Sequence, residues 1–131
     1  MEYFKKKNIP EPFWITDTKE DDARVPRFLQ RKKEIGVDPR EAWGVDYAFV
    51  VWLFNILSLL LDEGGQIIDF EFHDYTIAGK TKNQEQWMQH MLTLSEKYLR
   101  VADTIDGERE NYYRLNAIVK IFSKVIHQMW W

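Results

Sequence analysis

The chain of 131 residues contains no cysteine. Disulfide bonds, thiolate nucleophiles and cysteine-based zinc or iron–sulfur sites are therefore excluded. No apolar run follows the charged residues at its start, so we expect no signal peptide. Together the two absences favour a protein of the cytoplasm.

Several signatures of catalysis are missing as well. The sequence has no Glu-x-x-His pair of the kind that holds metal between helices. Gly79-Lys80-Thr81 resembles the end of a phosphate-binding loop, but Asp74 stands where that loop needs a glycine. The serines lie in helical stretches without a nucleophile elbow. We therefore expect no cofactor, and the sequence favours a protein that is not an enzyme.

An excess of positive charge is also missing. The chain carries 18 basic and 21 acidic side chains, a net charge of −3. Residues 1–35 are slightly basic, yet acidic residues between Asp17 and Asp22 interrupt their lysines and arginines. Proteins that bind duplex nucleic acid normally show a larger positive excess on one face. We therefore do not expect nucleic acid to be the partner.

Aromatic residues, by contrast, are abundant: six Trp, six Tyr and eight Phe. Such side chains fill cores and are frequent at binding surfaces. Helical periodicity places most of the large ones on inward faces: Trp43, Trp52, Trp87, Tyr98, Tyr112 and Phe122. Phe13, Trp14, Trp130 and Trp131 are not explained in this way. These four residues are the candidate contacts for a partner, which includes a second copy of the chain in a homodimer.

The hydrophobic pattern predicts a mainly α fold, a small bundle of three main helices and a short N-terminal helix with a minor β-hairpin. Pro10 and Pro12 lead us to expect an irregular arm over residues 1–25, before a single helical domain at 26–131. The helices are expected at 26–35, 39–62, from 81 or 83 to about 101, and 108–130, and the hairpin near 67–79.

The helix at 39–62 has the clearest start signal. Asp38 is an N-cap residue followed by Pro39 and, three residues on, by Glu41, whereas Gly64-Gly65 would end the helix. Residues 47–61 carry no charge. That run is shorter than the roughly 18–20 residues needed to cross a membrane. We therefore expect a buried central helix and no membrane span.

The expected hairpin contains the most reactive set of side chains. Asp69, Glu71 and His73 alternate with apolar residues, and residues two apart on a strand point to the same face. Such a face could bind Mg²⁺ or Mn²⁺. The solvent-exposed face of an edge strand gives the same alternation, and we prefer that interpretation.

The order of three segments resembles a group of small, uncharacterised conserved proteins of tailed bacteriophages. The segments are Trp43-Gly44-Val45-Asp46-Tyr47, Glu85-Gln86-Trp87-Met88-Gln89-His90-Met91-Leu92, and the stretch 122–131 that ends on Trp130-Trp131. The resemblance covers about residues 38–131. It implies a phage or prophage source and therefore a bacterial host cytoplasm, but no established activity.

These features predict a small phage accessory protein that binds a protein of the bacterial host or of its defence systems without catalysis. Two alternatives stay open. One is a metal-dependent phosphoesterase or nuclease that uses Asp69, Glu71 and His73. The other is a nucleotide-sequestering protein with an aromatic pocket.

Overall fold

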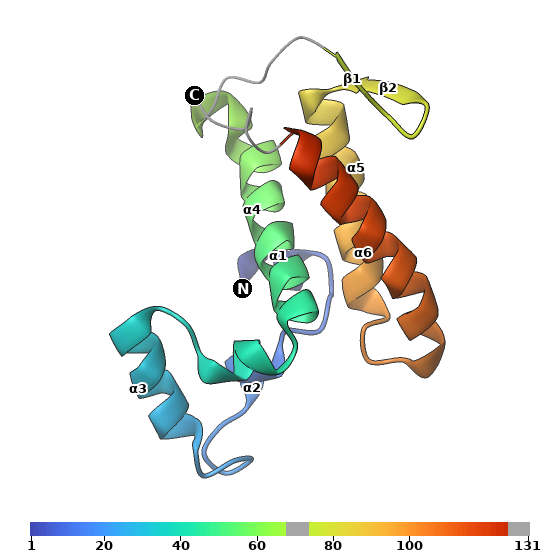
Figure 1. Cartoon of the computed structure of the whole chain (residues 1–131). Helices are drawn as coiled ribbons and strands as arrows, with labels where there is room; N and C mark the ends of the chain where they lie inside the picture. The colour runs from blue at the N-terminus through green and yellow to red at the C-terminus, as the bar shows by residue number, and fades with distance from the viewer. Residues whose placement is uncertain (68–73, 126–131) are drawn as a thin grey trace. The chain divides into compact units, whose positions relative to one another are not determined.

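Helices make up most of the chain, and one antiparallel β-hairpin accompanies them (Figure 1). The computed structural model describes residues 1–67 and 74–125. The chain forms two compact units, an N-terminal unit at Met1–Phe49 and a C-terminal unit at Val50–Trp131. The sequence suggested a division after residue 25, whereas these units divide inside a helix. The mainly α fold with a minor hairpin is confirmed.

The first 25 residues contain more structure than the irregular arm we expected. Helices α1 (Glu2–Lys6) and α2 (Phe13–Thr16) each form a single turn. Pro12 is the N-cap residue of α2 and has an extended backbone. Proline interrupts a helix from within but is tolerated at its start, so the two prolines separate the turns without preventing them.

Helix α3 (Val25–Ile35) lies where the sequence predicted it, and Gly36 ends it. Gly36 has a left-handed backbone with φ of +83°, and its N–H donates to the Lys32 carbonyl at 2.8 Å. This is the usual glycine stop. After it, Asp38 and Glu41 form the predicted capping box.

The helix predicted at 39–62 is wrong at both ends. Residues Pro39–Trp43 form the short 3-10 helix η1, and Gly44 then leaves helical geometry before α4 (Val45–Ile67) begins. At the other end α4 continues through Gly64 and Gly65. Glycine disfavours a helix by only about 1 kcal/mol, so the surrounding structure decides whether one ends there.

The hairpin consists of β1 (Asp74–Ile77) and β2 (Lys80–Asn83), paired antiparallel. Ala78 and Gly79 form its two-residue loop, and both have positive φ, as a type I′ turn requires. The hairpin was expected somewhat earlier, near 67–79, and its predicted first strand lies partly outside the described residues. Asn83, one of the two starts that the sequence left open, opens α5 (Gln84–Arg100) with a capping box to Gln86.

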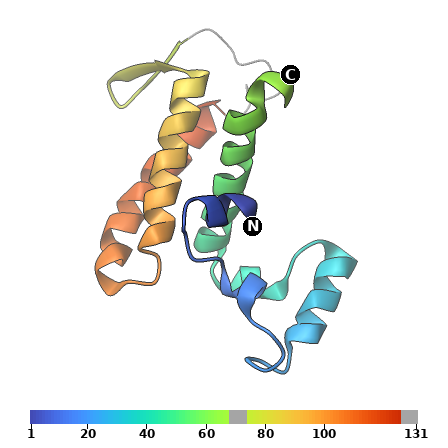
Figure 2. The same ribbon diagram turned by 180° about the vertical axis from the view of Figure 1, so that it is seen from behind.

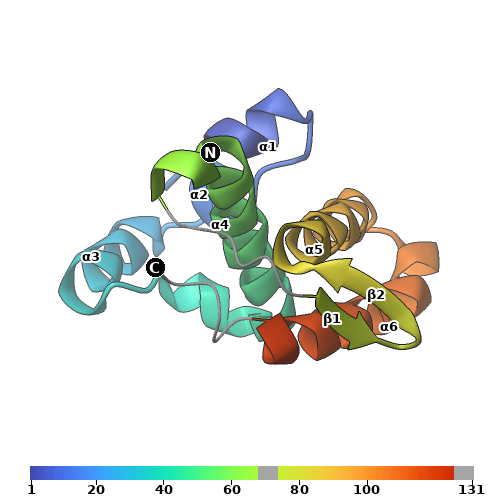
Figure 3. The same cartoon turned by 90° about the horizontal axis from the view of Figure 1, so that it is seen from above.

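Helices α5 and α6 (Ile105–Val125) run antiparallel side by side (Figure 2). The hairpin lies where α5 begins and α6 ends, with β2 next to α5 and β1 next to α6 (Figure 3). The Trp87 indole N–H donates to the Tyr75 carbonyl at 2.9 Å and ties the hairpin to α5. Helix α6 begins at Ile105, earlier than expected, because the Thr104 hydroxyl accepts the Gly107 N–H at 3.0 Å and caps it.

The buried apolar residues of the C-terminal unit come mainly from α4, α5 and α6. They include Val50, Leu53, Phe54, Leu57, Trp87, Met88, Met91, Tyr98, Leu99, Ile118, Ile121 and Val125. Of the six aromatic residues expected to face inward, Trp87 and Tyr98 are buried. The prediction is wrong for Trp43, Trp52 and Tyr112, which are exposed, because helical period alone does not fix which part of a broad apolar face is covered.

Candidate functional site

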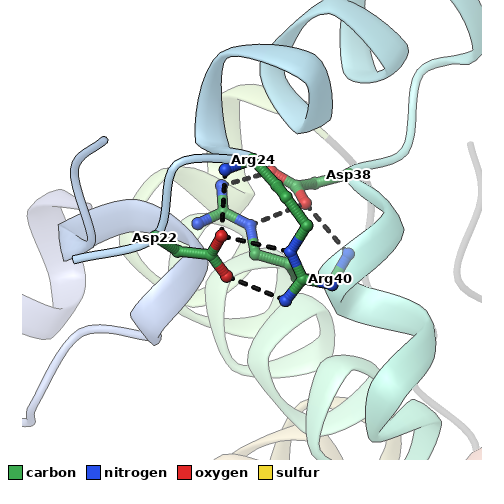
Figure 4. Close-up of polar contacts among 4 residues, drawn as sticks. All are labelled: Asp22, Arg24, Asp38 and Arg40. Atoms are coloured by element: carbon green, nitrogen blue, oxygen red, sulfur yellow. Dashed lines mark hydrogen bonds and ion pairs between the residues drawn. The ribbon is translucent and has the colours of Figure 1, made fainter. Parts of the chain in front are cut away.

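Two Asp-x-Arg segments of the N-terminal unit make matching sets of hydrogen bonds: Asp22-Ala23-Arg24 and Asp38-Pro39-Arg40 (Figure 4). In each, one carboxylate oxygen accepts the backbone N–H and the Nε–H of the arginine, and the other accepts Nη2–H. The three distances are 2.9, 3.1 and 2.9 Å at Arg24 and 3.0, 3.0 and 2.7 Å at Arg40. Paired N–H groups on a carboxylate fix the plane of the guanidinium.

The Asp38–Arg40 pair is buried, with 1% and 2% of the two side chains exposed. Arg40 Nη2 also donates to the Trp14 carbonyl at 3.1 Å, which joins η1 to α2. The hydrogen bond from Arg40 holds the pKa of Asp38 below its usual range, and the same bond raises the pKa of Arg40. The pair is therefore ionised at neutral pH and acts as a structural clamp.

The Asp22–Arg24 pair has the same geometry at the surface. Hydrogen bonds from the Arg24 side chain and backbone lower the pKa of Asp22 to about 2. The Arg24 guanidinium carbon lies 5.3 Å from the centre of the Phe28 ring and 5.4 Å from that of Trp43. These distances fit cation–π contacts, for which arginine and tryptophan are favourable partners.

The aromatic rings around the arginines contact one another. Phe28 meets Trp43 edge to face at 5.6 Å, and the Arg40 guanidinium carbon lies 5.3 Å from the centre of the same Phe28 ring. Trp43 also stacks on Phe13, with ring centres 5.9 Å apart and an interplanar angle of 18°. We call Phe13, Trp14, Arg24, Phe28, Arg40 and Trp43 the aromatic–arginine cluster.

The cluster has a buried base and an exposed shelf. Trp14, Phe28 and Arg40 are buried. Trp43 is 57% exposed and Phe13 38% exposed. Their stacked rings, which we call the Phe13–Trp43 shelf, therefore face solvent. Every member of the cluster comes from the N-terminal unit. With no nucleophile or metal-ligand set among its members, the arrangement is suited to recognition.

Two of the four contact residues suggested by the sequence belong to the cluster. Phe13 lies on its exposed shelf, whereas Trp14 is buried and packs edge to face on Tyr47 at 5.6 Å. A direct role of either residue in binding stays a prediction. Sequence reasoning missed Arg24, Arg40 and the exposure of Trp43. The repeated Asp-x-Arg spacing was the signal that could have pointed to the two arginines.

The remaining site predictions fall where the structure gives no description. Trp130 and Trp131 lie outside the described residues, as do Asp69, Glu71 and His73. Within residues 1–67 and 74–125, no three His, Cys, Asp or Glu side chains gather as a metal site would require. The metal-dependent alternative therefore stays a prediction.

Comparison with protein-family models, curated proteins and solved structures gives no match to this chain. In the described part of the chain, one helical segment, Val45–Glu63, is long and apolar enough to cross a membrane. A core helix of a water-soluble protein meets the same test, and this segment is partly buried in the protein.

Proposed function

We propose that the protein is a non-catalytic protein-binding module whose partner contacts Phe13, Arg24 and Trp43. The exposed Phe13–Trp43 stack beside Arg24 is the observation that carries this proposal. Tryptophan and arginine are enriched among the residues that dominate binding energy at protein interfaces. Contacts to Asp22 and Phe28 hold these groups in place, which lowers the entropy lost when a partner binds.

The charge balance of the cluster favours a protein over a nucleotide as its ligand. Each of its arginines is already paired with its own carboxylate, Asp22 or Asp38. A phosphate group would compete with those carboxylates and would be repelled by them. An apolar side chain that binds on the Phe13–Trp43 shelf carries no charge and is not repelled by these carboxylates.

The charges of α3 suggest what surrounds that apolar contact on the partner. Arg27, Lys32 and Lys33 are exposed, and within residues 1–67 and 74–125 neither Arg27 nor Lys33 has a carboxylate partner. A partner with an apolar anchor flanked by acidic residues would complement this helix. The phage resemblance would make that partner a protein of the bacterial host cytoplasm.

Affinity capture from bacterial lysate with matched tryptophan variants tests the proposal. Trp43→Ala removes the shelf, whereas Trp52→Ala removes a half-exposed tryptophan of the C-terminal unit. Circular dichroism checks that both variants fold. We expect the wild type and Trp52→Ala to retain a common protein that Trp43→Ala loses.

Calorimetry with that purified protein then measures the affinity directly. Loss of a hot-spot tryptophan costs about 2 kcal/mol or more, so Trp43→Ala should weaken binding by roughly thirtyfold. Equal binding by Trp43→Ala and the wild type would refute the assignment of this surface. A nucleotide that raises the melting temperature of the wild type but not of Trp43→Ala would favour the sequestering alternative.

A further inference from the structure

The face of the hairpin that meets the helices carries two lysines. Lys80 and Lys82 are two residues apart on β2, so they point to the same face of the hairpin. Lys80 pairs across the hairpin with Ile77, which is buried. Because cross-strand partners share a face, the two lysines lie on the side that packs against the helices.

Lys82 reaches the side chains of α5 directly. Its Nζ lies 3.4 Å from His90 Nδ1 and 4.9 Å from the centre of the Trp87 ring. The rings of Trp87 and His90 meet edge to face at 5.7 Å. An ammonium group can only donate, so Nδ1 is the acceptor and the imidazole is neutral, with its proton on Nε2. The hydrogen bond and the cation–π contact together hold the Lys82 ammonium in place.

The lysines around His90 act on it together. Burial lowers the pKa of His90. The positive charges of Lys82, Lys80 and Lys97 lower this pKa further. Among the residues that the structure describes, none of the three lysines has an ion-pair partner. We call Lys80, Lys82, His90 and Lys97 the lysine–histidine cluster.

The acidic residues of the same elements lie on other sides or are already paired. Glu96 of α5 pairs with Arg100 at 3.3 Å. Glu85 is five residues before the histidine, about 140° round the helix. Asp74 is one register position from the partner of Lys82 and therefore lies on the opposite face of the hairpin. The positive charges of the cluster are thus left without a nearby counter-charge from these carboxylates.

The polar groups of the cluster suit an oxyanion. Each lysine offers N–H donors and no acceptor, and the neutral His90 offers its Nε2–H. A phosphate dianion has acceptor oxygens only, and lysine is a common ligand of phosphate groups in proteins. Three lysines also match two negative charges better than the single charge of a carboxylate. The repulsion among the lysines is relieved when such an ion binds.

We propose that the lysine–histidine cluster binds a phosphate dianion, either free or as the terminal group of a small phosphorylated molecule. The site lies wholly in the C-terminal unit and is independent of the aromatic–arginine cluster. Trp87 is buried beneath the lysine and offers no open ring face for a base. The phosphate group itself is therefore what the cluster recognises.

An NMR titration of the full chain with inorganic phosphate tests the proposal. The imidazole C–H signal of His90, identified by its loss in His90→Gln, reports the pKa of the ring. Bound phosphate should raise this pKa towards the ordinary 6.5, because a nearby negative charge favours the protonated ring. Sodium chloride at the same ionic strength is the reference, since salt alone also screens the lysines.

Charge variants assign the binding to the cluster. Lys82→Gln should weaken phosphate binding about tenfold, because a charge-assisted hydrogen bond is lost. Lys82→Arg keeps the charge and should retain most of the affinity, which separates loss of charge from loss of structure. Lys120→Gln on α6 makes the same change in net charge outside the cluster and should bind phosphate like the wild type.

Adenosine monophosphate and adenosine distinguish the sources of the phosphate. Tighter binding of the monophosphate than of inorganic phosphate would assign the group to a nucleotide, and equal or weaker binding would assign it to the free ion. Three results would overturn the proposal: a pKa of His90 that phosphate raises no more than chloride does, an affinity that Lys82→Gln leaves unchanged, or an equal effect of adenosine.

Discussion

At the scale of single residues, one local motif works in two environments. Asp22–Arg24 and Asp38–Arg40 share their spacing and hydrogen bonds, but only the second pair is buried. Exposed ion pairs contribute about 0–1 kcal/mol to stability. A buried pair costs far more to break, because the remaining charge is left without compensation.

Replacement of Arg40 by alanine should therefore destabilise the protein by roughly 3–5 kcal/mol. The substitution leaves Asp38 buried without its counter-ion and removes the bond to the Trp14 carbonyl. Urea unfolding measured by circular dichroism gives the change. Arg31→Ala, which breaks the exposed pair with Glu34, is the matched control and should cost less than about 1 kcal/mol. Similar values for the two variants would contradict the role of Arg40 as a clamp.

The Asp22 carboxyl should titrate with a pKa of about 2 in the folded protein. Because this pKa is lower than the ordinary 3.8, the Arg24 contact stabilises the fold above pH 3.8 and ceases to do so as the pH falls through about 2. Arg24→Gln should raise the pKa towards its ordinary value. Carboxyl-carbon chemical shifts in an NMR titration give both values, and an unchanged pKa in the variant would count against the pairing.

The sequence revealed only part of this site, for a physical reason. Hydrogen bonds within Asp-x-Arg are local and could have been predicted from spacing. The contacts of Phe13 and Arg24 with Trp43 join three separate segments, α2, the start of α3 and η1. Helical period assigned Trp43 to the core, since period alone does not show where a chain turns away at Gly44.

At the scale of elements, caps were more predictable than helix interiors. The capping boxes at Asp38 and Asn83 depend on side chains three residues apart; the sequence predicted the first, and the second lies at one of the two helix starts that it left open. Glycines were less informative about where a helix begins or ends. Gly36 ends α3, whereas Gly107, just before the helix expected at 108–130, lies within the first turn of α6.

Gly107 has a packing role that reverses the usual effect of alanine. In an ordinary helix glycine to alanine stabilises by up to about 1 kcal/mol. Here a Cβ would overlap the Val101 carbonyl oxygen and lie 2.6 Å from the Thr104 hydroxyl. Gly107→Ala should therefore lower the free energy of unfolding by about 1–3 kcal/mol. Thermal or urea unfolding measures it beside Ser123→Ala, an exposed control on α6; a stabilised Gly107→Ala would refute the close approach.

At the scale of the whole molecule, the hydrophobic pattern predicted the fold class, whereas tertiary packing decided which apolar residues are covered. Helical period places Tyr112, Ile118 and Val119 on one broad apolar face of α6. Only Ile118 is buried, because α5 and the hairpin occupy one side of the helix.

The last prediction concerns helix α4. After lysis of expressing bacteria, the full chain should be found in the aqueous fraction and not in the membrane pellet. Its segment Val45–Glu63 is long and apolar enough to cross a membrane, but Val50, Leu53 and Leu57 are buried within the protein, as in a core helix. Membrane pelleting and alkaline carbonate extraction of expressing bacteria measure the distribution. Leu57→Asp adds a second readout: a charge in a protein core should abolish the helical circular dichroism signal of the aqueous protein. A wild-type chain retained in the carbonate-washed membrane would instead make α4 a membrane span.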